Sequence, residues 1–178
     1  YDLSVENNDF NLINSPLYNS SGWISFDGTN QYANRGSSLT LNLIPSNNRT
    51  IEVWGRVNTL GSMGGLFADQ YQSTGALMVM DTGRFLWRWD DSSTIITYQS
   101  QKQLSAQEWF QFVVILRDSY YVTYYVNGKL DTSEFITTDT ASSGNSNWSI
   151  GRQNRDFSGD FYYLNCDISI AKQYNRIL

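Results

Sequence analysis

Alternation of residues with a period of two recurs along this chain and constrains its fold more than any other feature. The longest example is WFQFVVILRDSYYVTYYVNGKL, which runs from Trp109 to Leu130. Aromatic and β-branched residues in such alternation are typical of β-strands. We therefore predict two long strands joined by a turn at residues 117–119 and ended by a second turn at Asn127 and Gly128. Because both faces carry apolar residues, we expect this hairpin to lie centrally in a sheet that is covered on both sides.

Shorter segments of the same kind follow one another along the rest of the chain. No apolar stripe with a period of 3.6 residues persists for three turns, so no helix is expected. Residues 23–32 predict a hairpin whose turn is Asp27–Gly28. A dozen or so short strands of this kind predict two packed antiparallel sheets, a β-sandwich. The other expected strands are residues 10–13, 39–43, 50–57, 66–70, 76–80, 84–89, 95–99, 148–151, 161–164 and 167–174.

Composition excludes several classes of function. The chain has no histidine and a net charge of −5, and no cluster of Lys or Arg stands out. Nucleic-acid binding therefore lacks its electrostatic footprint, and a basic membrane-surface patch is also missing. No apolar run approaches the roughly 18 residues of a membrane span, so no membrane insertion is expected. Cys166 is the single cysteine, which rules out an intrachain disulfide and predicts a small buried apolar group.

Several short motifs occur in a familiar order. The most specific is FDGTN-x-Y, at residues 26–32. The others are D-L-S at 2–4, N-S-P-L-Y at 14–18, T-I-E-V-W at 50–54, Trp109 with Y-V-N-G-K-L at 125–130, S-I-G-R at 149–152 and Y-N-R-I-L at 174–178. Together they resemble the laminin G-like domains of the concanavalin A-like lectin/glucanase superfamily. The resemblance implies one all-β domain over residues 1–178, a two-sheet antiparallel jellyroll β-sandwich. Because the chain starts at Tyr1 without an initiator Met and ends abruptly at Leu178, we expect this domain to belong to a longer or processed protein.

Catalysis is not expected, although this superfamily includes laminarinase-type glycosidases. Those enzymes carry their carboxyl groups on one strand as E-x-D-x-E or E-x-D-x-x-E, and no such triplet occurs here. Glu52, Glu108 and Glu134 each stand alone. Without histidine, Ser-His-Asp and Cys-His schemes are excluded as well.

The segment RFLWRWDD, with the strand after it, is the candidate ligand-binding surface. Trp87 and Trp89 share one face of a strand, Asp90 and Asp91 follow, and Tyr98 is expected across the hairpin. Aromatic rings beside fixed polar groups are how a sugar site is built. The alternative interpretation is that the two tryptophans fill the core.

Asp27 is the candidate metal ligand in this sequence. The resemblance allows a Ca²⁺ ion, since many secreted relatives have I-D-E near the last strand, but this chain has Ser169 and Ile170 at the matching positions. Asp27 could supply a hard oxygen ligand, and the alternative is that it belongs to an Asp-Gly turn. No cofactor is required by either interpretation.

The resemblance implies a non-catalytic carbohydrate-binding or adhesion module, of the type found in secreted bacterial and phage structural or adhesion proteins. The expected partners are a cell-surface glycan or other virion or surface proteins, and the expected location is extracellular or on a virion surface. Homo-oligomer formation through flanking regions is compatible with this setting. The alternative hypothesis is a structural virion component that makes protein–protein contacts without a glycan site.

Overall fold

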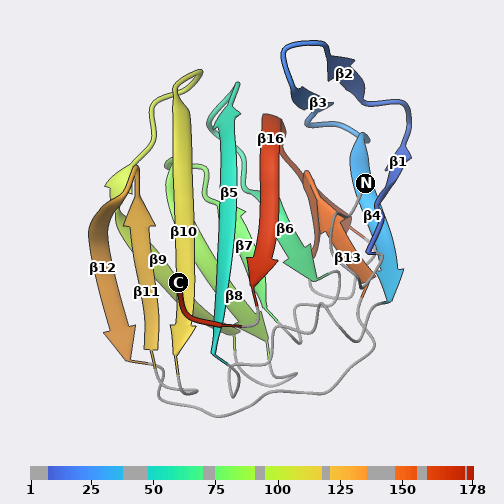
Figure 1. Ribbon diagram of the computed structural model, residues 1–178. Helices are drawn as coiled ribbons and strands as arrows, with labels where there is room; N and C mark the ends of the chain where they lie inside the picture. The colour runs from blue at the N-terminus through green and yellow to red at the C-terminus, as the bar shows by residue number, and fades with distance from the viewer. Residues whose placement is uncertain are drawn as a thin grey trace.

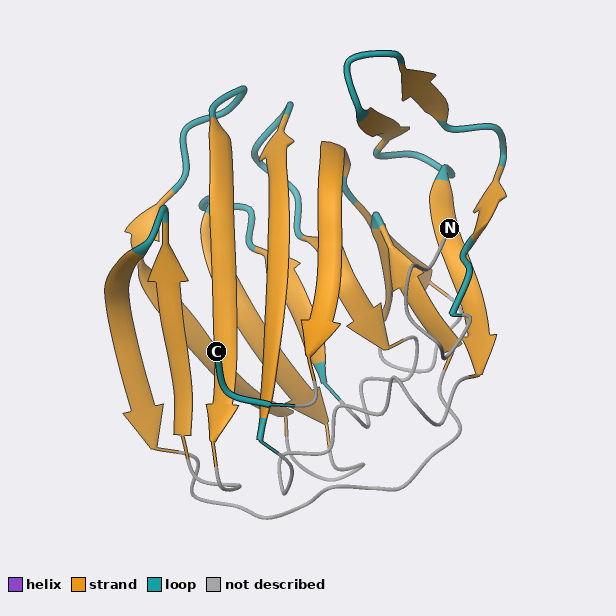
Figure 2. Cartoon of the chain, in the orientation of Figure 1, coloured by secondary structure: helices purple, strands orange, loops and turns teal. Residues whose placement is uncertain are grey.

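Two antiparallel sheets of seven strands each face one another in the computed structural model (Figure 1). The structure describes residues 8–37, 48–69, 75–90, 95–117, 121–135, 147–155, 160–174 and 176–178. These residues form strands, turns and loops, with no helix among them, as Figure 2 shows. The described residues accordingly contain no helix that could cross a membrane. The predicted all-β antiparallel sandwich is confirmed.

The sheet at the rear of Figure 1 is called the back sheet, and the other the front sheet. In spatial order, the back sheet consists of β1 (Asn11–Ile13), β4 (Tyr32–Ser37), β13 (Asn147–Ile150), β6 (Gly64–Asp69), β7 (Ala76–Val79), β8 (Arg84–Asp90) and β9 (Ile95–Gln103). The front sheet consists of β12 (Lys129–Phe135), β11 (Tyr121–Val126), β10 (Trp109–Arg117), β5 (Arg49–Val57), β16 (Asn165–Tyr174), β3 (Trp23–Asp27) and β2 (Leu17–Asn19). A separate small hairpin joins β14 (Arg152–Arg155) to β15 (Asp160–Tyr163).

The main hydrophobic core lies between the two sheets, because each strand turns its alternate apolar side chains inward. On β5, Ile51 and Val53 are fully buried, whereas Glu52 and Trp54 between and beyond them are not. Phe85 of the back sheet stacks on Phe112 of the front sheet, with ring centroids 3.7 Å apart. Cys166 is also buried in this core, as predicted, and burial raises the pKa of its thiol far above the ordinary value.

The long central hairpin is β10 and β11, which pair in antiparallel register from Phe112–Val126 to Arg117–Tyr121. Asn127 and Gly128 have φ values of 51° and 73°, the left-handed conformation that a two-residue hairpin turn requires, so this turn is confirmed. The prediction that the hairpin is covered on both sides is wrong. Its outer face is only partly buried, because the side chains there, such as Gln111 and Thr123, tolerate water.

The predicted hairpin at residues 23–32 is also wrong. Its first half is β3 of the front sheet and pairs with β2 and β16, whereas β4, which begins at Tyr32, belongs to the back sheet. The chain therefore crosses between sheets at Asp27–Gly28 and does not fold back on the same sheet. The strand expected at residues 39–43 lies outside the described residues.

Candidate functional site

The tryptophans whose side chains the structure describes divide between the core and the outer surface of the front sheet. Trp87 and Trp148 are fully buried in the core. Trp54 and Trp109 are each 40% exposed on the outer face, and Trp23 is partly buried beside them. We call Trp23, Trp54, Trp109, Arg56 and Asp167 the aromatic site.

Strand alternation and one glycine place these side chains together. On β5, Trp54 and Arg56 share the outer face with Glu52, while Val53, Gly55 and Val57 face the core. Arg56 pairs with Trp109 of β10 on one side and with Asp167 of β16 on the other. A Cβ at Gly55 would come within 2.7 Å of the Asp167 carbonyl oxygen, so glycine is needed for β16 to approach this closely.

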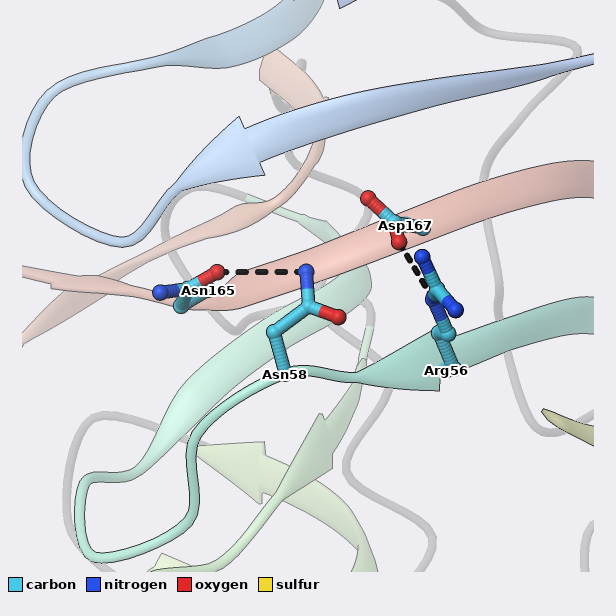
Figure 3. Close-up of polar contacts among 4 residues, drawn as sticks. All are labelled: Arg56, Asn58, Asn165 and Asp167. Carbon is cyan, nitrogen blue, oxygen red and sulfur yellow. Dashed lines mark hydrogen bonds and ion pairs between the residues drawn. The ribbon is translucent and has the colours of Figure 1, made fainter. Parts of the chain in front are cut away.

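Arg56 is fixed at the centre of the aromatic site. Its Nε donates to Asp167 Oδ2 at 2.5 Å, and the Asp167 side chain is only 3% exposed (Figure 3). The guanidinium carbon lies 5.6 Å from the Trp23 ring centroid and 5.4 Å from that of Trp109. The two indoles meet edge to face with centroids 5.5 Å apart. The ion pair and the two cation–π contacts therefore hold one another in a single arrangement.

Glu52 orients the outer part of the site. Its Oε1 accepts hydrogen bonds from Trp54 Nε1 at 2.9 Å and Gln111 Nε2 at 2.8 Å, and its Oε2 accepts one from the Tyr174 hydroxyl at 3.3 Å. Desolvation raises the pKa of Glu52, but these hydrogen bonds and the charge of Lys172 together outweigh it, so the pKa lies below its ordinary value. At neutral pH the carboxylate is ionised and serves as a hydrogen-bond acceptor for the indole.

Two adjoining depressions open on this surface. The first has a volume of about 430 Å³, and its polar lining includes Arg56, Asn58, Asn165 and Asp167, which Figure 3 shows. Asn58 Nδ2 donates to Asn165 Oδ1 at 3.3 Å. The second, of about 270 Å³, is lined by Ser21, Trp23, Trp54, Trp109, Ser169 and Ile170. Volumes of a few hundred Å³ are in the range of small-molecule sites.

The predicted binding residues around RFLWRWDD do not form this surface. Trp87 and Tyr98 are cross-strand partners on β8 and β9, as expected, but both rings belong to the core. Neither ring offers a free face, which corrects their prediction as stacking residues. The physical reason is that Trp87 shares the inner face of β8 with Phe85 and packs against Gly75, where an added Cβ would lie 2.2 Å from the indole.

The side chains of the other three predicted residues lie outside the part of the chain that the structure describes. Trp89 and Asp90 lie at the end of β8, paired with Ile96 and Ile95, and Asp91 lies outside the described residues. Their role in binding stays a prediction. The tryptophans of the aromatic site were missed. Trp23 and Trp54 share the outward faces of their strands with polar residues such as Ser25 and Glu52, which is the signal that identifies these two.

Asp27 stabilises the loop through which the chain crosses from the front sheet to the back sheet. Its Oδ1 accepts hydrogen bonds from the backbone N–H groups of Thr29, Asn30 and Gln31 at 2.8, 3.1 and 3.1 Å. Desolvation raises its pKa, but the backbone hydrogen bonds together outweigh it, so the pKa lies below its ordinary value. Gly28, with φ 74°, provides the left-handed turn. The interpretation of Asp27 as a turn residue agrees with this geometry.

A Ca²⁺ site at Asp27 stays a prediction. One carboxylate oxygen of Asp27 is already occupied by three N–H donors. Among the residues that the structure describes, no group of three or more His, Cys, Asp or Glu side chains could hold a metal ion.

Fold and site together define a β-sandwich of the lectin type with an aromatic surface site. A family model for the concanavalin A-like lectin/glucanases superfamily matches residues 27–178, and the chain belongs to this superfamily. No curated protein matches the chain.

Solved structures with a similar fold include binding domains of toxins. The receptor-binding domain of botulinum neurotoxin C/D mosaic serotype has a TM-score of 0.74 at 16% identity, over 99% of this chain and 45% of that one. The binding domain of Paraclostridial Mosquitocidal Protein 1 has a TM-score of 0.68 at 18% identity, over 99% and 44%. The chain thus spans less than half the length of these structures, and identities this low show the shared fold alone.

Proposed function

We propose that this chain is a non-catalytic binding module that recognises glycan on an extracellular surface through the aromatic site. The observation that carries the proposal is the arrangement of three partly exposed indoles around the Arg56–Asp167 ion pair. Indole faces stack on the apolar faces of pyranose rings, while a fixed guanidinium–carboxylate pair offers both donors and acceptors to hydroxyl groups. The similarity to receptor-binding domains of toxins agrees with a module of this kind.

Absence of catalysis is part of the proposal and follows from the carboxylates on this surface. Asp167 is the cross-strand partner of Arg56, and Arg56 is four residues from Glu52 on β5. At a rise of roughly 3.3 Å per residue, Glu52 is therefore roughly 13 Å along the strand from the position of Asp167. A glycosidase needs its two carboxyl groups within about 5–9.5 Å. Asp27 is closer to Asp167, but its lowered pKa makes it a poor general acid at neutral pH.

The setting that we propose is a secreted or virion-surface protein whose module contacts a host or bacterial surface. A second candidate function, a structural component that makes protein–protein contacts, is favoured by the apolar residues of β2. Leu17 is 68% exposed and Tyr18 66% exposed, where β2 and β3 project at the upper right of Figure 1.

The test is a glycan array followed by calorimetric titration of the best glycan. We expect saturable binding, and an affinity at least about tenfold weaker for Trp109→Ala because a central aromatic contact is lost. Tyr121→Ala is the matched control, since Tyr121 is an equally exposed aromatic residue on the same sheet outside the aromatic site. Binding to no glycan would overturn the proposal and favour the structural alternative.

A further inference from the structure

The two depressions share one wall. Trp23 lines both of them, and it is the single residue among those that the structure describes to do so. Its ring meets Arg56 on the side of the first depression and Trp109 on the side of the second. The ridge between the depressions is therefore a single indole, and a chain-like ligand can pass across it.

The second depression has a fixed floor and rim. Ser169 lies at an irregularity of β16, between Ile168 and Ile170, and its hydroxyl donates to the Gly22 carbonyl at 2.9 Å. This bond ties β16 to the turn between β2 and β3. Trp54 on the opposite side is held by Glu52. These bonds hold the depression in one shape, and half of its lining residues are tryptophans, which suits stacking of a sugar ring.

The first depression is polar and carries no net positive charge. Asp27 and Asp167 supply two negative charges to its lining and Arg56 one positive charge, so the formal charges sum to −1. The lining of the second depression contains no charged residue. An anionic ligand would therefore meet no uncompensated cation, whereas the amides of Asn58 and Asn165 and the ion pair can all bond to neutral hydroxyl groups.

From these observations we infer that the two depressions are consecutive subsites for an uncharged oligosaccharide, with Trp23 between them. The first subsite fixes one sugar by hydrogen bonds, and the second stacks the next sugar against Trp54 and Trp109. This inference rests on the proposed function and adds the length and the charge of the ligand.

The experiment measures binding of the whole chain to neutral oligomers of glucose, mannose, galactose and N-acetylglucosamine, each from one to six units long. Oligomers of galacturonate of the same lengths are the acidic counterparts. Because two subsites hold one sugar each, we expect affinity for one neutral series to rise at least tenfold between one and two units and then to level off. We expect the uronate oligomers to bind at least tenfold more weakly.

Two variants assign the subsites separately. Asn58 lines only the first depression and Trp54 only the second. Asn58→Ala should weaken short and long oligomers alike, whereas Trp54→Ala should weaken the tetramer about tenfold and the monosaccharide by a clearly smaller factor. Trp23→Ala should weaken every length. Thermal midpoints of Asn58→Ala and Trp54→Ala that equal that of the unmodified chain show that both variants fold. The length series is measured on the unmodified chain, so it tests the inference even if a variant does not fold.

The outcomes separate this inference from the proposed function. Binding of a monosaccharide as tightly as its tetramer, or tighter binding of the uronates, overturns the two-subsite inference and leaves glycan recognition standing. Absence of binding to every neutral and acidic oligomer overturns both.

Discussion

Glu52 links the ionisation of one side chain to the geometry of the aromatic site. Its carboxylate accepts from Trp54 Nε1, Gln111 Nε2 and the Tyr174 hydroxyl, and its pKa lies below 4.5. In the unfolded chain, the same carboxyl group titrates near its ordinary value. The lower pKa in the folded state means that the ionised form contributes stability above about pH 4.5. That contribution is lost as the pH falls through the folded-state value.

We predict that Glu52→Gln lowers the urea midpoint of unfolding at pH 7 and has less effect at pH 3. The glutamine cannot ionise, so the midpoint of the variant lacks this part of the acid dependence. The measurement is the difference in urea midpoint between the two proteins from pH 7 to pH 3. The difference should shrink as the pH falls. A difference in urea midpoint that stays constant from pH 7 to pH 3 would show that ionisation of Glu52 does not contribute to the stability of the fold.

At the scale of the strands, the edges of the two sheets are the places where a strand of another chain could pair with the sandwich. β9 is an edge of the back sheet, and such an edge presents unpaired N–H groups to other chains. Asp131, on the edge strand β12 of the front sheet, closes part of it. Its carboxylate accepts from Gln101 N at 2.6 Å and from Lys102 N at 2.7 Å. One side chain thus joins the two sheet edges.

Asp131→Ala should expose these two amides of β9. We predict a loss of about 1–2 kcal/mol in the free energy of unfolding, because two hydrogen bonds to a charged acceptor disappear. Hydrogen exchange at Gln101 and Lys102 should become faster, and light scattering should show more association. Glu134→Ala is the matched control, since it removes the same charge from an exposed position on β12. If Glu134→Ala has an equal effect, the edge is governed by net charge and not by these two bonds.

Strand alternation was enough to predict most elements, since inward-facing residues such as Phe112 and Val53 repeat every second position. It was not enough to predict which strands pair. The segment around Asp27 and Gly28 has the composition of a tight hairpin turn, but three backbone N–H groups converge on the Asp27 carboxylate and the chain crosses to the other sheet. Pairing depends on which strands bury each other's faces, and local composition does not contain that information.

The site shows the same limit at the scale of the whole sandwich. A cluster of tryptophans and aspartates in sequence, as in RFLWRWDD, favoured a surface at Trp87. The aromatic site instead gathers Trp23, Trp54 and Trp109 from β3, β5 and β10, which come close only in the folded front sheet, where β16 lies between β5 and β3. Trp23 and Trp54 share their outward faces with polar residues such as Ser25 and Glu52, and this alternation was visible in the sequence. The proximity of the three tryptophans depends on the order of the strands in the sheet, which was not.

At the scale of the whole molecule, buried tryptophans stabilise the core and exposed ones form the aromatic site, so we predict that the two roles can be separated by substitution. Trp87 lies between the sheets at 0% exposure, and Trp109 lies outside them at 40%. Trp87→Leu should lower the free energy of unfolding by about 2–3 kcal/mol, because it leaves a cavity in the core. It should leave the glycan affinity of the folded fraction unchanged. Trp109→Ala should cost less than about 1 kcal/mol in stability, while weakening binding.

Urea unfolding and calorimetric titration of both variants, each at a temperature where it is fully folded, distinguish the two roles. Unfolding gives the stability, and the titration gives the affinity per folded molecule independently of it. Because the front sheet separates the core from the aromatic site, a repacked core should not reach the ligand. If Trp87→Leu abolished binding in a folded protein and Trp109→Ala did not, the ligand would have to bind near β8. Trp89 and Asp90, at the end of β8, would then be the next residues to substitute.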